Sequence, residues 1–367
     1  MNRPSMTGAW MTDIDDTLIE SGVMPNQDWI DWLSEIIEKL LTHGILWVPM
    51  SGVAISKLGP RILYRLPEKL LPGIIYYGGD GSQKYYYDAF SRSWAEDGGF
   101  GRVFTDSQAL AVIGKEEFLS VVSQADRSGI PCLNDIVGST SQGIGVMPDP
   151  QKRYENAAVE LRSKGFIYEE GILGEMKEVL ARSGYDPGLS ETYFRGGSVS
   201  WMMLGDVSAE PYKTEKAQMV RKTLFAYAEK RLAELDYLRG FGSAGVHTPF
   251  HGARGVKFVI MGNDKERGTL DLVRGEGLNP ERILFTGNEL YHGGNDNMIR
   301  NIPGVTLLSV GEKTDPGEYV VSGGCGTEAT RNWIEKICRC LDRGEDWEAI
   351  LRDIRTGNAH SHRHSCG

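Results

Sequence analysis

The sequence AWMTDIDDTL at residues 9–18 places a short apolar run directly before an acidic cluster. The apolar run, Ala9–Thr12, predicts a buried strand, and Asp13 and Asp15 follow it at once. The carboxyl ends of parallel strands form the ligand crevice of a sheet, so we expect both carboxylates to project into it. There they can divide attack on phosphorus and proton transfer between them, and their oxygens suit Mg²⁺. An acidic turn or helix cap is the alternative, because Asp and Thr also favour helix starts.

The sequence on either side of this cluster alternates strands and helices. Residues 28–41 carry apolar side chains at helical spacing, and apolar runs at 45–50 and 74–77 predict two further strands. Pro49 predicts a bulge or an early end to its strand, because proline cannot donate to a central ladder. Two further strands are expected at 283–286 and 305–310, and two further helices at 269–274 and 327–341. This alternation predicts a parallel sheet covered by helices.

The middle of the chain has a different texture. Polar helices that end at glycines are expected at 151–164 and 175–182, a longer helix at 214–235, and a strand-like piece at 194–204. We therefore predict an α/β protein. A Rossmann-like parallel core is formed by residues 1–88 and 256–367, and an α+β cap domain, residues 89–255, is inserted into it.

Composition limits the functional class. The 367 residues include 40 Lys and Arg against 50 Asp and Glu, so the net charge of −10 argues against a general nucleic-acid binder. It also means that a phosphorylated substrate needs local cations. The most apolar stretch, residues 44–55, is too short to span a membrane, and the first ten residues lack a signal-peptide core. Five cysteines without framework spacing fit reduced thiols. We expect a cytoplasmic protein without membrane or nucleic-acid partners.

Other expected strand ends also carry polar residues. Ser51 and Gly52 follow the second strand and offer a hydroxyl and a backbone N–H to a phosphate oxygen. Lys265 precedes an expected helix, where its charge can neutralise phosphate. The stretch GNELYHGGND at 287–296 follows a strand and supplies oxygen ligands. Each of these residues alone is more often an ordinary loop or surface residue, but their order along the chain is rare by chance.

In that order the motifs resemble those of the haloacid dehalogenase (HAD) superfamily of aspartyl-phosphate phosphohydrolases and phosphomutases. The insertion lies where members with a type-two cap, of the IIB kind, carry theirs. Within them, the chain is most similar to the phosphomannomutase and sucrose-phosphatase branch. Three stretches carry that likeness: GVKF at 255–258 leading to Asp264-Lys265, the loop 287–296 ending in Gly-Gly-Asn-Asp, and FRGG at 194–197.

The resemblance implies a role for each matching residue. Asp13 is expected to attack the phosphoryl group, and Asp15 to protonate the leaving alcohol and then activate water. The resemblance further implies that Ser51, the Gly52 amide and Lys265 bind the phosphate. It implies that Mg²⁺ is held by Asp13, Asp15 (through its carbonyl), Asn288 and Asp296. In the cap, the implied substrate contacts are Arg195, Gly197 and Ser198. Glu289 is an alternative metal ligand, because many members have aspartate where Asn288 stands.

Three departures separate the chain from the mutases of that branch. The loop 19–22 lacks their arginine, Asp206 stands where a second phosphate-binding arginine is usual, and Asp16 replaces a glycine. A mutase must hold a bisphosphate at both ends, so these changes favour hydrolysis. We therefore expect a Mg²⁺-dependent phosphatase of a small phosphorylated metabolite, and the cap likeness favours a sugar phosphate. A hexose phosphomutase and a non-catalytic phospho-ligand-binding relative are the alternatives.

Two further features have competing interpretations. The aromatic residues at 85–87 and Trp201 either stack on a sugar ring or pack at the joint between core and cap. The tail at 360–366 contains three histidines in seven residues, which is typical of metal-binding tracts, but it lacks apolar residues and is expected to be disordered.

Overall fold

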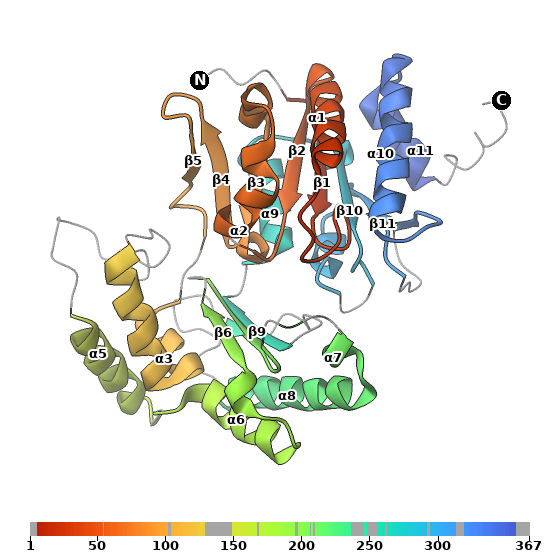
Figure 1. Ribbon diagram of the computed structural model, residues 1–367. Coiled ribbons are helices and arrows are strands. Elements are labelled where there is room, and N and C mark those ends of the chain that lie inside the picture. The colour runs from red at the N-terminus through yellow and green to blue at the C-terminus, as the bar shows by residue number, and fades with distance from the viewer. Residues whose placement is uncertain are drawn as a thin grey trace. The chain divides into compact units, whose positions relative to one another are not determined.

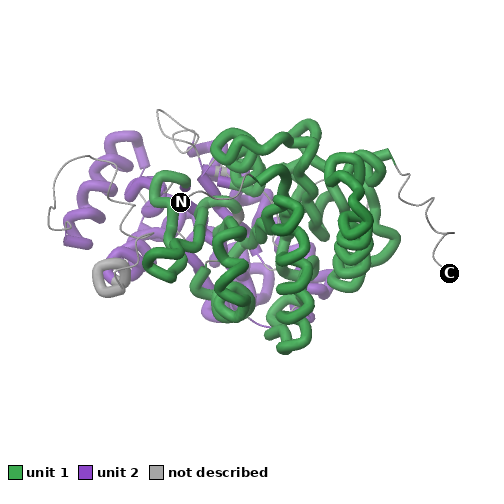
Figure 2. The backbone as a smooth tube through the Cα atoms, turned by 90° about the horizontal axis from the view of Figure 1, so that it is seen from above, with its two compact units in different colours: residues 1–100, 264–367 green, residues 101–263 purple. Residues whose placement is uncertain are grey.

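The computed structural model describes most of the chain: residues 6–53, 55–101, 104–128, 149–166, 169–194, 197–205, 207, 210–235, 246–247, 255–260, 263–291, 294–312 and 319–356. The chain forms two compact units. Unit 1 comprises residues 1–100 and 264–367, and unit 2 comprises residues 101–263 (Figure 2).

Unit 1 is built on an eight-stranded sheet in the order β12-β11-β10-β1-β2-β3-β4-β5 (Figure 1). The strands are β1 (Gly8–Asp13), β2 (Ile45–Met50), β3 (Ile75–Gly78), β4 (Gln83–Asp88), β5 (Ser93–Glu96), β10 (Ile283–Gly287), β11 (Thr306–Ser309) and β12 (Val320–Val321). The six strands from β12 to β3 are parallel, and β4 and β5 are added antiparallel. The predicted α/β core with a parallel-dominated sheet is confirmed. Because β1 lies inside the sheet, its carboxyl end has a strand on either side.

Helices cover both faces of this sheet. They are α1 (Gln27–Thr42), α2 (Ile55–Arg61), α9 (Lys265–Arg274), α10 (Gly326–Asp342) and α11 (Trp347–Arg355), with short 3-10 turns η1 (Leu63–Arg65), η2 (Glu68–Gly73), η3 (Gly79–Gly81), η6 (Pro280–Arg282) and η7 (Asn297–Asn301). Alternate residues of each strand point to opposite faces, so Trp10 packs with α1, α10 and α11, whereas Met11 packs with α9 and η7. Each face of the sheet therefore has its own apolar core.

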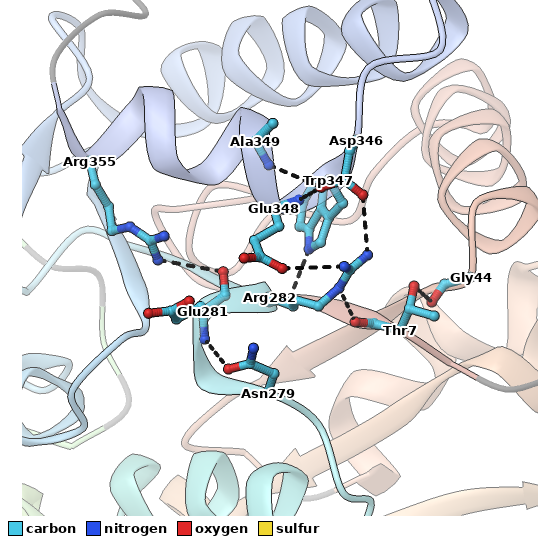
Figure 3. Close-up of polar contacts among 10 residues, drawn as sticks. All are labelled: Thr7, Gly44, Asn279, Glu281, Arg282, Asp346, Trp347, Glu348, Ala349 and Arg355. Atoms are coloured by element: carbon cyan, nitrogen blue, oxygen red, sulfur yellow. Dashed lines mark hydrogen bonds and ion pairs between the residues drawn. The ribbon is translucent and has the colours of Figure 1, made fainter.

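The last helix, α11, is fastened to the amino-terminal edge of the sheet by polar contacts (Figure 3). The Trp347 indole N–H donates to the Arg282 carbonyl at 2.8 Å, and the Arg282 Nε donates to the Thr7 carbonyl at 2.6 Å. Arg282 also faces Glu348, with 3.4 Å between Nη1 and Oε2. Asp346 caps the helix by accepting from the Glu348 backbone N–H at 2.9 Å. These contacts lie at the opposite ends of the strands from the acidic cluster.

Unit 2 has a four-stranded antiparallel sheet in the order β6-β7-β9-β8. Its strands are β6 (Glu191–Phe194), β7 (Ser198–Met202), β8 (Val246–His247) and β9 (Gly255–Ile260). Its helices are α3 (Asp106–Ser128, kinked at Gly114), α5 (Pro150–Ser163), α6 (Gly171–Arg182), α7 (Glu210–Lys213) and α8 (Glu215–Glu234), with a short 3-10 turn η4 (Pro187–Leu189). Helices and the inner face of the sheet share one apolar core that includes Val199, Trp201 and Phe258. This unit has the α+β character that the sequence predicts for the insertion.

The unit boundaries differ from the predicted limits at 88 and 256. Residues 89–100 belong to unit 1, because β5 pairs with β4 in the large sheet. Residues 256–263 belong to unit 2, because β9 pairs with β7 and β8 rather than with a core strand. The apolar run at 255–260 is thus a strand, as expected, but it lies in the small sheet.

Pro49 lies inside β2 instead of ending it. The ladder from β2 to β1 runs over all six residues, and Pro49 aligns with Thr12. Towards β3 the pairing is reduced to Met50 with Tyr77 and an isolated bridge between Trp47 and Ile74. We attribute the interrupted ladder to the missing proline N–H. Within the described part of the chain, no helix has both the length and the apolar character that crossing a membrane requires.

Candidate active site

The loop after β1 is tightly closed. Asp13 is the last residue of β1, and the backbone N–H groups of Leu18 and Ile19 both donate to the Ile14 carbonyl, at 2.9 and 3.0 Å. Asp16 adopts a φ of +59°, a left-handed conformation in which Asp is one of the more tolerated residues. Its carboxylate accepts from the backbone N–H and the hydroxyl of Ser21, at 2.9 and 2.8 Å. These bonds fix the backbone that carries Asp13 and Asp15.

A buried lysine joins Asp13 to a distant carboxylate. The Nζ of Lys265 donates to the Asp13 Oδ1 at 2.6 Å and also to the Asp296 Oδ1. The side chains of Lys265 and Asp296 are each 1% exposed, and that of Asp13 is 11% exposed. Three candidate residues from separate parts of the sequence thus meet at the carboxyl ends of β1 and β10. The Asp13 Oδ2 additionally accepts from the Thr17 hydroxyl at 3.3 Å.

The start of α9 sets the position of Lys265. Asp264 caps the helix by accepting from the Arg267 N–H at 3.0 Å, which makes Lys265 the first helical residue. The η3 turn packs directly on this cap. A Cβ at Gly81 would lie 2.0 Å from the Asp264 carbonyl oxygen, and Gly81 has a φ of +88°. Only glycine fits both requirements, so the turn after β3 holds the helix start in place.

Asp296 is placed by the loop after β10. Its Oδ2 accepts from the Glu289 backbone N–H at 3.0 Å, while its Oδ1 faces Lys265. Gly287, the last residue of β10, leaves room for this carboxylate, because a Cβ there would lie 2.2 Å from Oδ2. The close approach of Asp296 to the strand end therefore requires glycine at this position.

The three charges act strongly on one another because their side chains are buried. Burial raises the pKa of Asp13 to about 7, and the Asp296 carboxylate adds to this rise while Lys265 opposes it. Burial alone would lower the pKa of Lys265, but Asp13 and Asp296 outweigh it, so the lysine pKa is raised. With both carboxylates ionised, one ammonium leaves a net charge of −1 in this group. Such a site favours a further cation.

Ser51 lies at the next strand end. It follows β2 directly, is 2% exposed, and its N–H donates to the Tyr77 carbonyl at 3.0 Å. Its hydroxyl accepts from the Val53 N–H at 3.2 Å, and Gly52 lies between the two residues. The predicted phosphate-binding segment is therefore ordered at the edge of the sheet where Asp13 ends β1.

Asn288 faces a separate cavity of about 520 Å³ in unit 1. Five carboxylate side chains line it, from Asp16, Glu20, Glu289, Glu312 and Glu328. Among the residues that the structure describes, no lysine or arginine lines this cavity. Asn288, a predicted metal ligand, thus lines a cavity that is strongly acidic.

The residues present suit Mg²⁺ by their chemistry. Asp13 and Asp296 converge on one ammonium nitrogen and carry an uncompensated negative charge, and their donor atoms are oxygens, which Mg²⁺ prefers. No set of three or more His, Cys, Asp or Glu side chains in the described ranges is arranged to hold a metal ion. A bound cation would therefore also need a carbonyl such as that of Asp15, the Asn288 amide oxygen, water or phosphate oxygens.

The predicted cap contacts lie in unit 2. Arg195 lies outside the described residues, and so do Asp206 and the histidine-rich tail. Gly197 precedes β7, and its carbonyl accepts from the Ile260 N–H at 3.1 Å. Ser198 begins β7, is fully buried, and alternates with Val199, which faces the apolar core. Ser198 therefore lies on the opposite side of the small sheet from the helices.

The aromatic candidates are packing residues. Trp201 is 1% exposed in the core of unit 2. Tyr85, on β4, stacks on Tyr76 with 5.8 Å between ring centroids, and Tyr87 contacts the Trp94 ring edge-on at 6.0 Å. These contacts are packing contacts within unit 2 and within unit 1, instead of the predicted packing between core and cap.

Sequence reasoning missed one residue of the site, Arg61. This last residue of α2 forms an ion pair with Asp15, with 2.9 Å between Nη1 and Oδ1. The two residues are 46 positions apart, and the Asp-x-Asp motif contains no sign of a partner. The available signal was a pair of arginines, Arg61 and Arg65, in the helical stretch that follows Ser51 and Gly52.

Comparison with known proteins identifies the fold. Neither the protein-family models nor the curated protein sequences give a match. Among solved structures, IMP-bound Plasmodium falciparum IMP-nucleotidase matches with a TM-score of 0.51 and 11% identity, over 91% of this chain and 67% of that chain. The sucrose-phosphatase from Synechocystis, in complex with sucrose and phosphate, matches with a TM-score of 0.43 and 10% identity, over 90% and 98%. At 11% identity the match to the P. falciparum enzyme shows that the two chains share a fold and shows nothing further.

Proposed function

We propose that the chain is a Mg²⁺-dependent phosphatase that hydrolyses a small phosphorylated metabolite through an aspartyl phosphate on Asp13. The observation that carries the proposal is the buried Asp13–Lys265–Asp296 cluster at the carboxyl ends of β1 and β10, with Ser51 at the end of the adjacent β2. A carboxylate nucleophile, a fixed ammonium and a hydroxyl together suit phosphoryl transfer, which depends on positioning and charge neutralisation. The fold shared with IMP-nucleotidase supports the same class of reaction.

The residues divide the reaction into two steps. First, a carboxylate oxygen of Asp13 forms a bond to phosphorus while the bond to the leaving oxygen breaks, and Asp15 gives that oxygen a proton. Second, Asp15 takes a proton from water, whose oxygen attacks phosphorus and releases inorganic phosphate from Asp13. Lys265, the Ser51 hydroxyl and the Gly52 N–H hold the phosphate oxygens throughout. Mg²⁺, held by Asp13, the Asp15 carbonyl, Asn288 and Asp296, would neutralise phosphate charge and reduce its repulsion from Asp13.

Hydrolysis is favoured over the mutase alternative by missing cations. A mutase binds a sugar bisphosphate and needs cations for its second phosphate. The loop 19–22 contains no arginine, and Asp206 stands where the mutases of that branch carry a second phosphate-binding arginine. Asp16, where those mutases have glycine, adds a negative charge next to Asp15.

We propose two classes of substrate for this phosphatase, in order of preference. The FRGG stretch at 194–197 and the polar cap favour a sugar phosphate. The IMP bound to the P. falciparum enzyme, which shares the fold, makes a nucleoside monophosphate the second class. Both present a phosphate monoester on an alcohol, so the chemistry at Asp13 is the same.

The test is phosphate release from a panel of sugar phosphates, nucleoside monophosphates and polyol phosphates, each with Mg²⁺ and with EDTA. We expect release from one class that depends on the metal, and loss of that release in D13N, which preserves the volume of the side chain. Turnover by D13N comparable to that of the unaltered protein would exclude the aspartyl-phosphate route. Transfer of phosphate between positions of a sugar in the presence of a bisphosphate, without release, would instead establish the mutase.

A further inference from the structure

We propose that Arg61 is a positioning residue that orients the Asp15 carboxylate for proton transfer. This inference rests on the proposed function, because it assigns Arg61 a role in the same reaction. Arg61 and Asp15 both belong to unit 1, so the contact lies wholly within one unit.

The guanidinium of Arg61 is held by three acceptors on the loop that follows β1. Nη1 donates to the Asp15 Oδ1 at 2.9 Å, and Nη2 donates to the carbonyl oxygens of Glu20 and Val23, at 3.4 and 3.2 Å. The Arg61 side chain is 16% exposed. Because the Arg61 guanidinium also donates to two backbone carbonyls, its position does not depend on Asp15 alone. It can therefore hold the Asp15 carboxylate in one orientation.

The Asp15 carboxylate has little else to hold it. Its side chain is 31% exposed, and Arg61 is its one hydrogen-bond donor within the described ranges. The backbone is different, since Asp15 pairs with Ile19 in a bridge and the loop closes on Ile14. The main chain of Asp15 is therefore fixed without Arg61, whereas the direction of its carboxylate depends on Arg61.

Direction matters because Asp15 must reach the leaving oxygen in one step and a water molecule in the next. Misplacing a reacting group by about 1 Å can cost roughly 100-fold in rate. Loss of Arg61 should therefore lower kcat, while the binding of substrate, which relies on other residues, is largely kept. A residue that bound the substrate directly would instead raise KM.

Arg65 provides a matched control on the same segment. Its Nη1 donates to the Pro25 carbonyl at 2.6 Å, so it also ties the loop after β1 to the residues that follow Ser51. It makes no described contact with Asp15. Comparing R61Q with R65Q therefore separates support of the loop from orientation of Asp15, and thermal unfolding of both variants checks that each is folded.

The experiment measures kcat and KM for R61Q, R61K, R65Q, D15N and the double variant D15N/R61Q with Mg²⁺. The best substrate of the panel is used for the single variants. The D15N pair is measured with p-nitrophenyl phosphate, whose leaving group departs without a proton. We expect R61Q to lose roughly 10- to 100-fold in kcat with KM within about threefold, partial recovery in R61K, and R65Q within about twofold of the unaltered protein. In the D15N background, R61Q should cause no further loss.

Three results would overturn the proposal: an equal loss in R65Q, a raised KM with kcat retained in R61Q, or losses that multiply in D15N/R61Q. Failure of the proposed function looks different. In that case the unaltered protein releases no phosphate, or D13N is as active as the unaltered protein, and the role of Arg61 falls with it.

Discussion

At the scale of single residues, Lys265 is the cation that makes two buried carboxylates tolerable. The Lys265 side chain is 1% exposed, and its ammonium contacts both Asp13 and Asp296. Breaking a buried ion pair by removing one partner typically costs about 3–5 kcal/mol. The same residue thus serves stability and, in the proposed reaction, phosphate binding.

We therefore expect K265M to lower the free energy of unfolding by about 3–5 kcal/mol at pH 7.5 and to abolish phosphate release. K39M is the control, because Lys39 pairs with Asp342 at a surface where both side chains are about half exposed, and such pairs contribute under about 1 kcal/mol. Chemical denaturation of both variants makes the comparison. Equal stability of K265M and K39M would contradict the buried three-charge arrangement.

The raised pKa of Asp13 gives the site a pH dependence of known sign. Its folded pKa of about 7 lies above the ordinary value of 3.8, so the metal-free folded protein holds this proton more tightly than the unfolded chain. The stabilising contribution of the protonated group is present at low pH and is lost as pH rises through about 7. A cation binds the ionised carboxylate, so it acts most strongly at the higher pH.

We expect Mg²⁺ to raise the Tm more at pH 8 than at pH 5.5, because at pH 5.5 binding must first displace the Asp13 proton. Thermal unfolding with Mg²⁺ and with EDTA at both pH values measures this difference. In D13N the difference between the two pH values should shrink, since the titrating group is gone. An identical Mg²⁺ effect at pH 5.5 and pH 8 in the unaltered protein would show that Asp13 takes no part in binding the cation.

At the scale of elements, the central strands and several helices could be predicted because each shows an apolar run or a clear helical repeat of apolar side chains. Apolar runs predicted β1, β2, β3, β10 and β11, and 3.6-residue spacing predicted α1, α8 and α10. The β4–β5 hairpin was missed, because Tyr85, Tyr86 and Tyr87 do not alternate with polar residues. Helix α11 was also not predicted, although Asp346 is a helix-capping residue and Trp347 and Ile350 follow it at helical spacing on the buried face. Short elements carry too few turns for the pattern to stand out.

Helix α11 can be tested through its tryptophan. In W347F the ring still fills the buried space, but the Arg282 carbonyl loses the indole donor at 2.8 Å, and we expect a loss of about 1–2 kcal/mol in unfolding free energy. The matched control is W94F, because the Trp94 indole N–H is buried without a hydrogen-bond partner among the described residues. W94F should therefore cost less than W347F in the same denaturant titration. The reverse order would mean that the Trp347 bond adds nothing to the attachment of α11.

In the candidate site, too, residues within motifs could be predicted from the sequence, whereas contacts between distant segments could not. Motif order predicted Asp13, Lys265 and Asp296 as site residues, because chemistry restricts the residue types at those strand ends, and in the structure the three side chains are in contact. The Arg61–Asp15 contact joins residues 46 positions apart and could not be read from either segment. The location of β9 was also hidden, since an apolar strand fits a large sheet and a small one equally well.

At the scale of the whole molecule, the two units differ in how the chain builds them. Every strand of the small sheet and the apolar core around Trp201 and Phe258 come from the single segment 101–263. Unit 1 needs two segments, because β1 is paired with β2 from its own segment and with β10 from the other. Folding of unit 1 therefore requires pairing between two separate segments of the chain, whereas the strands of unit 2 pair within one continuous segment.

We expect a polypeptide of residues 101–263 to fold alone, with a helical circular dichroism spectrum and a cooperative thermal transition. The reason is that the described residues of its apolar core all come from this one segment. A polypeptide of residues 1–100 is the control. It should remain unfolded, since β1 would lose β10 on one side and the Trp10 face would lose its cover from α10 and α11. Adding a polypeptide of residues 264–367 to residues 1–100 should restore structure if the missing pairing is the cause. An unfolded 101–263 polypeptide would instead show that the inserted unit depends on unit 1 for its stability, and the cap would then have to be treated as part of one cooperative fold.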